Sequence, residues 1–446
     1  MDEWTTCLYA LLPHPDQLLV LSSDKDAGKA ILPGIRHIGR IWVPDTQTLM
    51  PLLEELTGVP VNILRYVAYY RDEEVHQSYC IYLLEPRGTM PDTDLWQPLA
   101  KILADSDIPP ALKEGLARWG DEQRLLVTPE RRAPWAKTGW HAKVEGWIED
   151  QVSSSGRGNV LRIEPIKSWS ISCVLKITTE TGVLYFKVPR DLPLFVNEGV
   201  VLSRLAEIFP DRVPVPVALD ATKGWMLLDD FGTPAGADAS LDYQTNLMQD
   251  FARLQIESSR NIERLLSAGC IDRRLEKLLA QIEPLFDDEI VLQTLTPKER
   301  EKLKQVPIRL RPLLAELFAL PIPVALLHGD LHAGNVVLRG NSFLYFDWTD
   351  AAISHPFFDM IHIFMEEDEA RKISLQEAYL SIWEENFPKN DVRRAWVLAS
   401  ALYGFYHAVS YQYIVRGIEE IVRSELNFAF YFLRKLLEGI ESLDTE

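Results

Sequence analysis

The pattern of apolar and polar positions predicts alternating regions of strands and helices along the chain. Between residues 159 and 188, the runs NVLRIEPI, ISCVLKITT and GVLYFKV are rich in β-branched and aromatic residues and are separated by KSWS and ETG. We expect three antiparallel strands there. The next segment, NEGVVLSRLAEIF, has apolar residues at helical spacing and predicts a helix that carries Glu198.

Strands and a helix are also predicted near the N-terminus. CLYALL and QLLVLSS are β-like, and VNILRYVAYYR and QSYCIYLLEP are expected to form a hairpin around DEEVH. Before that hairpin, TQTLMPLLEELTG places leucines on one face and ends at Gly58, a residue suited to a left-handed helix cap. Most of residues 92–152 and 239–320 is predicted to be helical, as are VRRAWVLASALYGFYHAVSYQYIV and ELNFAFYFLRKLLEGI.

Composition limits the class of protein. The 446 residues are 47% hydrophobic and 10% aromatic, as in a soluble protein with full cores. The four cysteines form no C-x-x-C pair, no stretch approaches eighteen apolar residues, and no basic segment precedes an apolar one at the N-terminus. We therefore expect a cytoplasmic location and no membrane span. The net charge of −19 disfavours a nucleic-acid partner and is compatible with a cationic ligand.

One stretch, LLHGDLHAGNVVLRGNSFLYFDWTD at residues 326–350, carries most of the candidate chemistry. His328, Asp330 and Asn335 follow an apolar run, and Asp347 ends the run FLYFD. VVLRG and SFLYFD flank a Gly-Asn turn, so a hairpin would bring Asn335 and Asp347 side by side. In phosphoryl transfer, one aspartate accepts the proton of the attacking hydroxyl, while an asparagine and a second aspartate hold magnesium. The alternative is a polar turn region in which these side chains only hydrogen-bond the loop.

HGDLHAGN followed by FDW resembles the catalytic and metal-binding motifs of the aminoglycoside phosphotransferase and choline kinase family. The resemblance implies a protein-kinase-like fold that uses ATP or GTP with Mg²⁺ to phosphorylate small molecules. It also implies Asp330 as catalytic base, with Asn335 and Asp347 as magnesium ligands. His328 would support the loop, and His332 would take the place of a lysine that protein kinases carry near the transferred phosphate.

Other residues are expected to bind the nucleotide. Lys187 lies in the third run among apolar neighbours, and pairing with Glu198 would let it reach the α and β phosphates. A surface ion pair is the alternative. The phosphate-covering loop is expected in KSWSIS, which contains no glycine, so the hydroxyls of Ser168, Ser170 and Ser172 would have to contribute.

A DFG sequence before the main motif is a misleading match. Asp230, Phe231 and Gly232 spell the DFG of protein kinases, but they precede the HGD loop, whereas the metal aspartate must follow it. We therefore interpret residues 227–231, with Asp229 and Phe231, as a hinge whose backbone would bind adenine.

Residues after the main motif are expected to support the site. Asp359 resembles the family's aspartate that braces the catalytic loop, and His362 and His407, flanked by apolar residues, are expected to be core histidines. Residues 366–369 form an acidic run that, with the negative net charge, favours an amine-bearing substrate such as an aminoglycoside, amino sugar or amino alcohol. A solvated helix face is the alternative for this run.

The order of elements in the first domain, with LPG followed by LLEELTGV, resembles a Nudix domain whose catalytic box is degenerate. The Nudix helix binds divalent metals through several glutamates. Here Pro51, Leu52 and Leu56 replace charged box residues, and only Glu55 and Gly58 keep their places. Because hydrolysis of a diphosphate needs clustered carboxylates, we expect this domain to be non-catalytic.

The sequence thus predicts an α+β protein with an α/β Nudix-like domain at residues 1–130 and a two-lobed kinase-like domain at residues 131–446. The β-rich small lobe would span about 135–230, and the helical large lobe about 231–446. The expected function is phosphorylation of a hydroxyl of a small molecule, and the alternative is a catalytically weak pseudokinase or nucleotide sensor. Oligomeric state stays open, including a dimer formed through the first domain.

Overall fold

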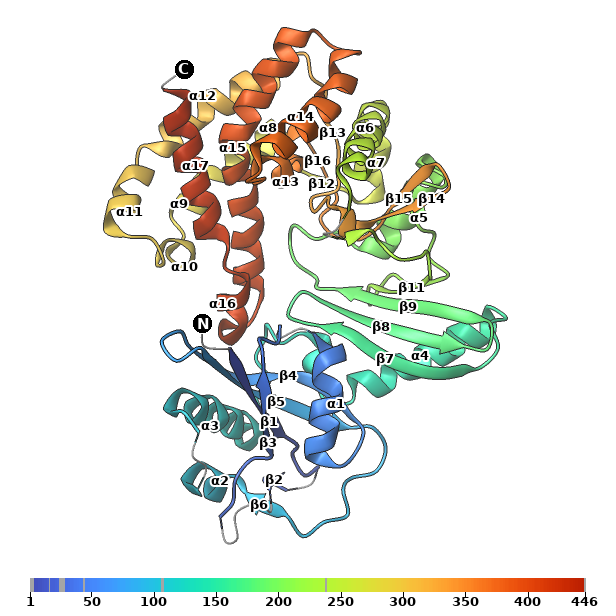
Figure 1. Cartoon of the computed structure of the whole chain (residues 1–446), viewed down its shortest axis with the longest axis vertical. Helices are drawn as coiled ribbons and strands as arrows, with labels where there is room; N and C mark the ends of the chain where they lie inside the picture. The colour runs from blue at the N-terminus through green and yellow to red at the C-terminus, as the bar shows by residue number, and fades with distance from the viewer. Residues whose placement is uncertain are drawn as a thin grey trace. The chain divides into compact units, whose positions relative to one another are not determined.

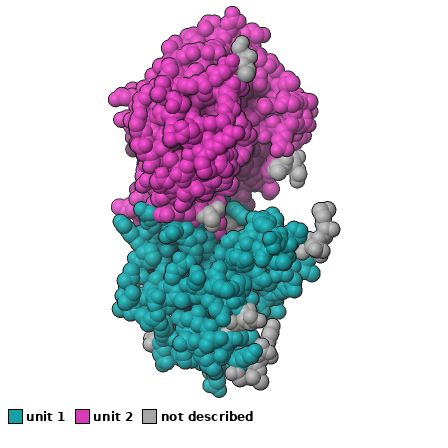
Figure 2. Space-filling model, turned by 90° about the vertical axis from the view of Figure 1, so that its left-hand side faces the viewer, with its two compact units in different colours: residues 1–188, 418–422 teal, residues 189–417, 423–446 magenta. Residues whose placement is uncertain are grey.

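The computed structural model describes residues 4–15, 17–23, 29–42, 45–105, 108–236 and 239–444 (Figure 1). The chain forms two compact units, which Figure 2 shows in different colours. Unit 1 comprises residues 1–188 and 418–422, and unit 2 comprises residues 189–417 and 423–446. The predicted domain boundary near residue 130 falls within unit 1, and it stays a prediction.

Unit 1 contains a four-stranded sheet in the order β3-β1-β5-β4. Its strands are β1 (Thr5–Leu11), β3 (Gly34–Ile38), β4 (Val61–Asp72) and β5 (Gln77–Pro86). β4 and β5 pair antiparallel, which confirms the predicted hairpin, and β5 also pairs in parallel with β1. Helices α1 (Thr46–Thr57) and α3 (Pro110–Leu125) cover opposite faces of the sheet, and each buries its own apolar core against it (Figure 1).

Helix α1 begins and ends for local reasons that are visible in the sequence. Asp45 caps its first turn, because its side chain accepts the Thr48 N–H at 3.2 Å. Leu49 and Leu53 are fully buried on the sheet side. Gly58 ends the helix with φ 71°, as predicted, since glycine adopts this left-handed conformation without strain. The likeness to a Nudix domain stays a prediction.

The rest of unit 1 includes the three predicted strands. They are confirmed as β7 (Val160–Ser168), β8 (Ser172–Thr179) and β9 (Gly182–Pro189), which neighbour one another in this order. The other described elements of the unit are β2 (Leu19–Leu21), β6 (Trp96–Pro98), α2 (Leu99–Asp105), the 3-10 helix η1 (Pro134–Ala136), α4 (Trp140–Ser154) and the 3-10 helix η5 (Glu420–Val422).

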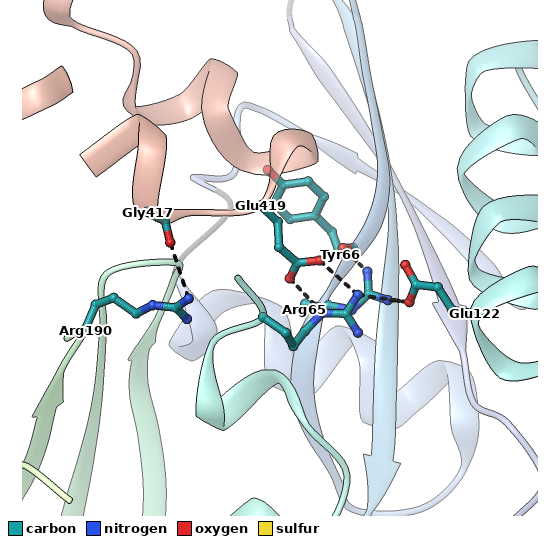
Figure 3. A network of polar contacts seen from close by, with 7 residues as sticks. Arg65, Tyr66, Glu122, Arg190, Gly417 and Glu419 are labelled. Atoms are coloured by element: carbon teal, nitrogen blue, oxygen red, sulfur yellow. Dashed lines mark hydrogen bonds and ion pairs between the residues drawn. The ribbon is translucent and has the colours of Figure 1, made fainter. Parts of the chain in front are cut away.

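Residues 418–422 come from the C-terminal part of the chain but are held in unit 1 by ion pairs (Figure 3). Glu419 pairs with the buried Arg132 at 2.7 Å, and Arg132 also pairs with Glu122 at 2.9 Å. Glu122 in turn pairs with Arg65 at 2.8 Å. Because arginines and glutamates alternate in this network, each largely buried charge has an opposite partner, and the segment is a fixed part of the unit.

Unit 2 begins with the predicted helix α5 (Glu198–Ile208) and the hairpin of β10 (Ala218–Asp220) and β11 (Trp225–Asp229). Most of the unit is helical, as the sequence predicts. Its longer helices are α6 (Leu241–Ser258), α7 (Ile262–Ala268), α8 (Leu275–Ala280), α9 (Ile282–Phe286), α11 (Pro297–Leu303), α12 (Val306–Ala319), α14 (Glu369–Glu384), α15 (Lys389–Gly417) and α17 (Ala429–Leu443). Its shorter helices are α10 (Glu289–Leu292), α13 (Ile361–Phe364), α16 (Arg423–Leu426), η3 (Ala333–Asn335) and η4 (Pro356–Asp359).

Short strands in unit 2 carry the segments of the predicted site. β12 (Ile271–Asp272), β16 (Ala352–Ser354) and β13 (Ala325–Leu327) form a small sheet in that order. β14 (Val336–Arg339) and β15 (Ser342–Tyr345) pair as an antiparallel hairpin. Within the described ranges, no helix is both long and apolar enough to cross a bilayer.

Candidate active site

The HGD loop follows strand β13 and is held by a buried carboxylate. Asp359 accepts the backbone N–H of His328 at 2.7 Å and that of Gly329 at 2.8 Å, which confirms the expected brace. Burial raises the pKa of Asp359 to about 7, although these two backbone bonds oppose the shift. Gly329 has φ 87°, and a Cβ there would lie 2.4 Å from the Asp350 side chain. The loop therefore presents Asp330 in a fixed orientation.

His328 joins this loop to the segment that precedes Asp347. The side chain is fully buried, and its Nε2 lies 2.8 Å from the Phe346 carbonyl. Burial lowers the pKa of His328 to about 4, so the ring is neutral near pH 7 and Nε2–H donates to that carbonyl. The ring centroid also lies 4.6 Å from that of Trp348. This position fits the scaffold role that the resemblance implies.

Asp330 is half-exposed and lies between two imidazoles. The Nε2 atoms of His332 and His362 lie 3.7 Å and 3.9 Å from its carboxylate oxygens. Burial favours the neutral acid, but the two imidazoles outweigh it and hold the pKa of Asp330 well below its usual range. His332 Nδ1 accepts the Gly334 N–H at 3.0 Å, so the proton of the neutral ring lies on Nε2, the atom near Asp330. The Asp330 carboxylate is therefore ionised at neutral pH, as a proton acceptor must be.

Asn335 is bonded to Asp330, and the β14–β15 hairpin carries it next to the segment of Asp347. The predicted hairpin is confirmed, and the backbone N–H of Phe346, the residue before Asp347, donates to the Asn335 carbonyl at 3.0 Å. The Asn335 Nδ2 donates to the Asp330 backbone carbonyl at 2.9 Å and lies 3.3 Å from its carboxylate. Both bonds use the amide nitrogen, so the amide oxygen Oδ1 is the atom left for another ligand.

Asp347 has a backbone conformation that residues other than glycine rarely adopt. Its φ is 64°, in the left-handed region, and such conformations often occur at functional sites. The buried Glu198 fixes the residues that follow: it accepts the Trp348 N–H at 3.0 Å and lies 2.9 Å from the Thr349 hydroxyl. That hydroxyl also lies 3.2 Å from Asp347 Oδ1. The surrounding contacts therefore hold Asp347 in its strained conformation.

Asn335 and Asp347 fit a magnesium ion by the chemistry of their donor atoms. An amide oxygen and a carboxylate are hard oxygen ligands, and Mg²⁺ is usually bound by one or two carboxylates together with water and substrate phosphates. In the part of the chain that the structure describes, no three His, Cys, Asp or Glu side chains are grouped to hold a metal by themselves. A magnesium ion held by Asn335 and Asp347 would take its remaining ligands from water or substrate phosphates.

The other predicted site residues lie in both units. In unit 1, Ser168 ends β7, the Ser170 hydroxyl is buried without a hydrogen-bond partner, and Lys187 is nearly buried on β9. In unit 2, Asp229 ends β11 and Phe231 packs against the core of the unit. Their roles toward a nucleotide stay predictions, and so does the pairing of Lys187 with Glu198.

A cavity of about 540 Å³ opens in unit 2 beside Asp330. Clefts of several hundred cubic ångströms are typical of small-molecule sites. Glu366 and Arg371 line it and pair with each other at 3.1 Å. The remaining lining is mixed, and its principal side chains are Gln244, Leu247, Met248, His332, Met360, His362, Ile363 and Leu375.

The prediction that His362 is a core histidine is wrong. Its side chain is 55% exposed, lines the cavity and reaches Asp330 from α13. The apolar neighbours of His362 in the sequence do not predict its exposure, because one side of the four-residue helix α13 faces the core while the other side faces solvent. No sequence signal indicates the contact, because Asp330 and His362 lie on separate elements that only folding brings together. His407 is buried with its Nε2 3.2 Å from the Phe358 carbonyl, which confirms that prediction.

The α+β fold and the HGD loop braced by Asp359 are those of a kinase-like phosphotransferase. Residues 162–396, slightly more than half of the chain, match the phosphotransferase enzyme family, and the chain belongs to that family. It is therefore an enzyme of the small-molecule kinase class. Among curated proteins, none matches the sequence significantly.

Parts of the chain are also similar to solved structures at low identity. Macrolide 2'-phosphotransferase type I shares 15% identity, with 64% of this chain and 95% of that one covered and a TM-score of 0.46. A choline/ethanolamine kinase family protein from Mesorhizobium loti shares 13%, with 67% and 99% covered and a TM-score of 0.46. The GDP complex of wild-type aminoglycoside 2'-phosphotransferase-IIIa shares 14%, with 67% and 99% covered and a TM-score of 0.46. With identities of 13–15% and TM-scores of 0.46, these similarities assign no substrate to this chain.

Proposed function

We propose that this chain transfers a phosphoryl group from ATP or GTP to a hydroxyl of a small molecule, with magnesium. One observation carries the proposal: the ionised, half-exposed carboxylate of Asp330 borders a cavity of about 540 Å³ and is bonded to Asn335. An acceptor bound in this cavity would bring its hydroxyl to Asp330. Asn335 and Asp347 would hold the magnesium ion of the nucleotide.

The proposed reaction breaks one P–O bond and forms another. The hydroxyl oxygen attacks the γ-phosphorus, the bond from this phosphorus to the oxygen that bridges to the β-phosphate breaks, and the nucleoside diphosphate leaves with the electron pair. Asp330 accepts the proton of the hydroxyl. His332 and His362 stabilise the ionised form of Asp330 before the proton arrives. When bound, magnesium neutralises charge on the phosphates.

For the nucleotide we propose the contacts that the sequence predicts. Lys187, Ser168 and Ser170 would bind the phosphates, and the backbone at Asp229 and Phe231 would bind the base. The position of Lys187 on strand β9 supports this assignment, because a strand holds the side chain in a defined direction.

For the acceptor we propose a small molecule that carries an amine. Glu366 is the member of the acidic run that lines the cavity, while Asp368 caps α14 and Glu369 pairs with Lys372 at 3.6 Å. A cationic acceptor could bind Glu366 in place of Arg371. Glu366→Gln should therefore raise the KM for an amine-bearing acceptor several-fold, whereas Glu369→Gln should not. Much higher kcat/KM for neutral sugars than for their amine-bearing analogues would contradict this proposal.

The test of the function is consumption of ATP or GTP with magnesium by the full chain, against a panel of hydroxylated acceptors with and without amines. We expect nucleoside diphosphate and phosphorylated acceptor in equal amounts, with both lost in Asp330→Ala. Nucleotide binding without phosphorylation of any acceptor would instead favour a pseudokinase or nucleotide sensor, to which the glycine-free KSWSIS loop gives some support.

A further inference from the structure

The turn between β7 and β8 is closed by the side chain and backbone of one tryptophan. Trp169 donates its backbone N–H to the Ser172 carbonyl at 3.1 Å and its indole Nε1–H to the Ser172 hydroxyl at 2.7 Å. Both residues belong to KSWSIS, the segment predicted to cover the nucleotide phosphates. The Ser172 hydroxyl is thus already engaged within the turn.

A second tryptophan, from outside the hairpin, holds the same turn. Trp135 in η1 donates its indole Nε1–H to the Trp169 carbonyl at 2.7 Å. Trp135 is 1% exposed, and its ring centroid lies 6.2 Å from that of Trp140 in α4. Because packing fixes the Trp135 ring, the carbonyl that it binds has little freedom to move.

A third tryptophan approaches from the segment before α1. The ring centroids of Trp42 and Trp169 lie 5.6 Å apart, with an interplanar angle of 62°. The Lys167 ammonium lies 4.3 Å from the centroid of the Trp169 ring and 5.7 Å from that of Trp42, as in cation–π contacts. Trp42 is 56% exposed, so the need to bury an apolar side chain does not account for its place beside the turn.

We propose that Trp42, Trp135 and Trp169 brace this turn in the conformation that receives the nucleotide phosphates. Trp42 and Trp135 precede residues 162–396, which match the family. Residues from the N-terminal part of the chain would therefore help to shape the nucleotide site. A glycine-rich loop loses much conformational freedom when it binds phosphate, whereas a turn that is already held loses little. The brace would offset the absence of glycine. Its effect on nucleotide binding rests on the proposed function, while the fixing of the turn rests on its contacts alone.

The test compares two tryptophan-to-phenylalanine variants of the full chain. Trp135→Phe removes the N–H that binds the Trp169 carbonyl but keeps an aromatic ring in place. Trp119→Phe is the matched control, because Trp119 is 2% exposed in the same unit and its indole nitrogen has no hydrogen-bond partner. Trp42→Ala is a second variant at an exposed position, where the substitution leaves the core intact.

Two readouts are measured: backbone amide hydrogen exchange in residues 166–172, and the KM and kcat for the nucleotide. In Trp135→Phe we expect exchange in the turn to rise by about tenfold, as for the loss of one hydrogen bond, and the nucleotide KM to rise by a similar factor. The kcat should change by less than about twofold, because the catalytic groups stay in place. Trp42→Ala should change exchange and KM in the same direction by about twofold. Trp119→Phe should change neither.

Equal exchange in Trp135→Phe and Trp119→Phe would contradict the proposal that Trp135 holds the turn. Faster exchange in Trp135→Phe with an unchanged nucleotide KM would overturn the role of the brace in nucleotide binding. If the unsubstituted chain neither bound nor consumed a nucleotide, the proposed function would fail, and the exchange measurement would still decide whether Trp135 holds the turn.

Discussion

At the scale of single residues, the charge state of Asp330 depends on its neighbours more than on its own burial. Two imidazoles within 3.9 Å hold its pKa well below the usual range, although burial acts in the opposite direction. His332 belongs to the sequence motif. His362 does not, and it reaches the carboxylate from an element that the sequence assigns to the core.

We predict that His362→Gln shifts the pH dependence of activity. Asp330 must be ionised to accept a proton, and the variant removes one of the groups that lower its pKa. The acidic limb of a plot of kcat/KM against pH should therefore move to higher pH. His37→Gln, on β3 in unit 1, is the control and should leave the profile unchanged. An unchanged acidic limb in His362→Gln would show that His362 does not act on Asp330.

Residue roles could be predicted where a local pattern determines them. The order and spacing of the motif predict Asp330 and Asn335 as site residues, and their roles stay predictions. The brace from Asp359, which the family resemblance implies, is confirmed by its bonds to the loop. The sequence predicts Glu198 as a partner for Lys187, but no sequence pattern indicates that the Glu198 carboxylate accepts the backbone N–H of Trp348. That bond joins residues 150 positions apart, and only folding brings them together.

At the scale of elements, close packing of α15 on α17 depends on two glycines. A Cβ at Gly404 would lie 2.4 Å from the Phe432 carbonyl, and a Cβ at Gly439 would lie 2.4 Å from the Ala401 carbonyl. These are backbone atoms, which cannot give way without moving a helix. The sequence predicts both helices, but it does not show that their backbones touch at these positions.

We predict that Gly404→Ala lowers the free energy of unfolding by about 1–3 kcal/mol, the range for overpacking a closely packed site. Gly146→Ala is the matched control, since Gly146 lies inside α4 and a Cβ there would meet nothing within 4 Å. The control should raise the free energy of unfolding by about 0.5–1 kcal/mol, because alanine is the better helix former. Urea unfolding of both variants and of the original chain measures these changes in the free energy of unfolding. Equal changes in the free energy of unfolding in the two variants would show that the contact between α15 and α17 leaves room for a Cβ at residue 404.

We also predict that helix α1 supports no diphosphate hydrolysis. Glu55 is exposed, and Glu54 Oε1 accepts the Val61 N–H at 3.4 Å, so the helix offers no cluster of free carboxylates. The full chain with magnesium or manganese should not hydrolyse ADP-ribose or nucleoside diphosphate sugars. Turnover of these compounds that disappears in Glu55→Gln would overturn this prediction.

At the scale of the whole molecule, the sequence predicts element types well and the grouping of elements less well. Strands β7, β8 and β9 and the long helices follow from the period of their apolar positions. The place of residues 418–422 in unit 1 does not, because it depends on ion pairs such as that between Arg132 and Glu419, which are 287 positions apart. Spacing in the chain carries no information about such pairs.

Buried neutral histidines make stability depend on pH. Burial lowers the pKa of His407 to about 3, whereas an unfolded histidine titrates near 6.5. As pH falls below 6.5, the unfolded chain binds a proton that the folded chain does not bind, so the free energy of unfolding falls by up to about 1.4 kcal/mol per pH unit for this group. His407→Gln lacks this contribution. The difference in stability between the original chain and the variant should therefore shrink from pH 7 to pH 4, and a constant difference in urea unfolding would contradict the assignment of a neutral buried ring.

The most direct test of the account compares Asp330→Ala with Asp347→Ala in turnover and in binding of the magnesium nucleotide. Asp330→Ala should lower kcat by about two orders of magnitude or more, as for the loss of a general base, and should leave nucleotide binding intact. Asp347→Ala should weaken binding of the magnesium nucleotide, because its carboxylate is proposed as a metal ligand. Full activity in Asp330→Ala, or loss of nucleotide binding in that variant with unchanged binding in Asp347→Ala, would contradict the account.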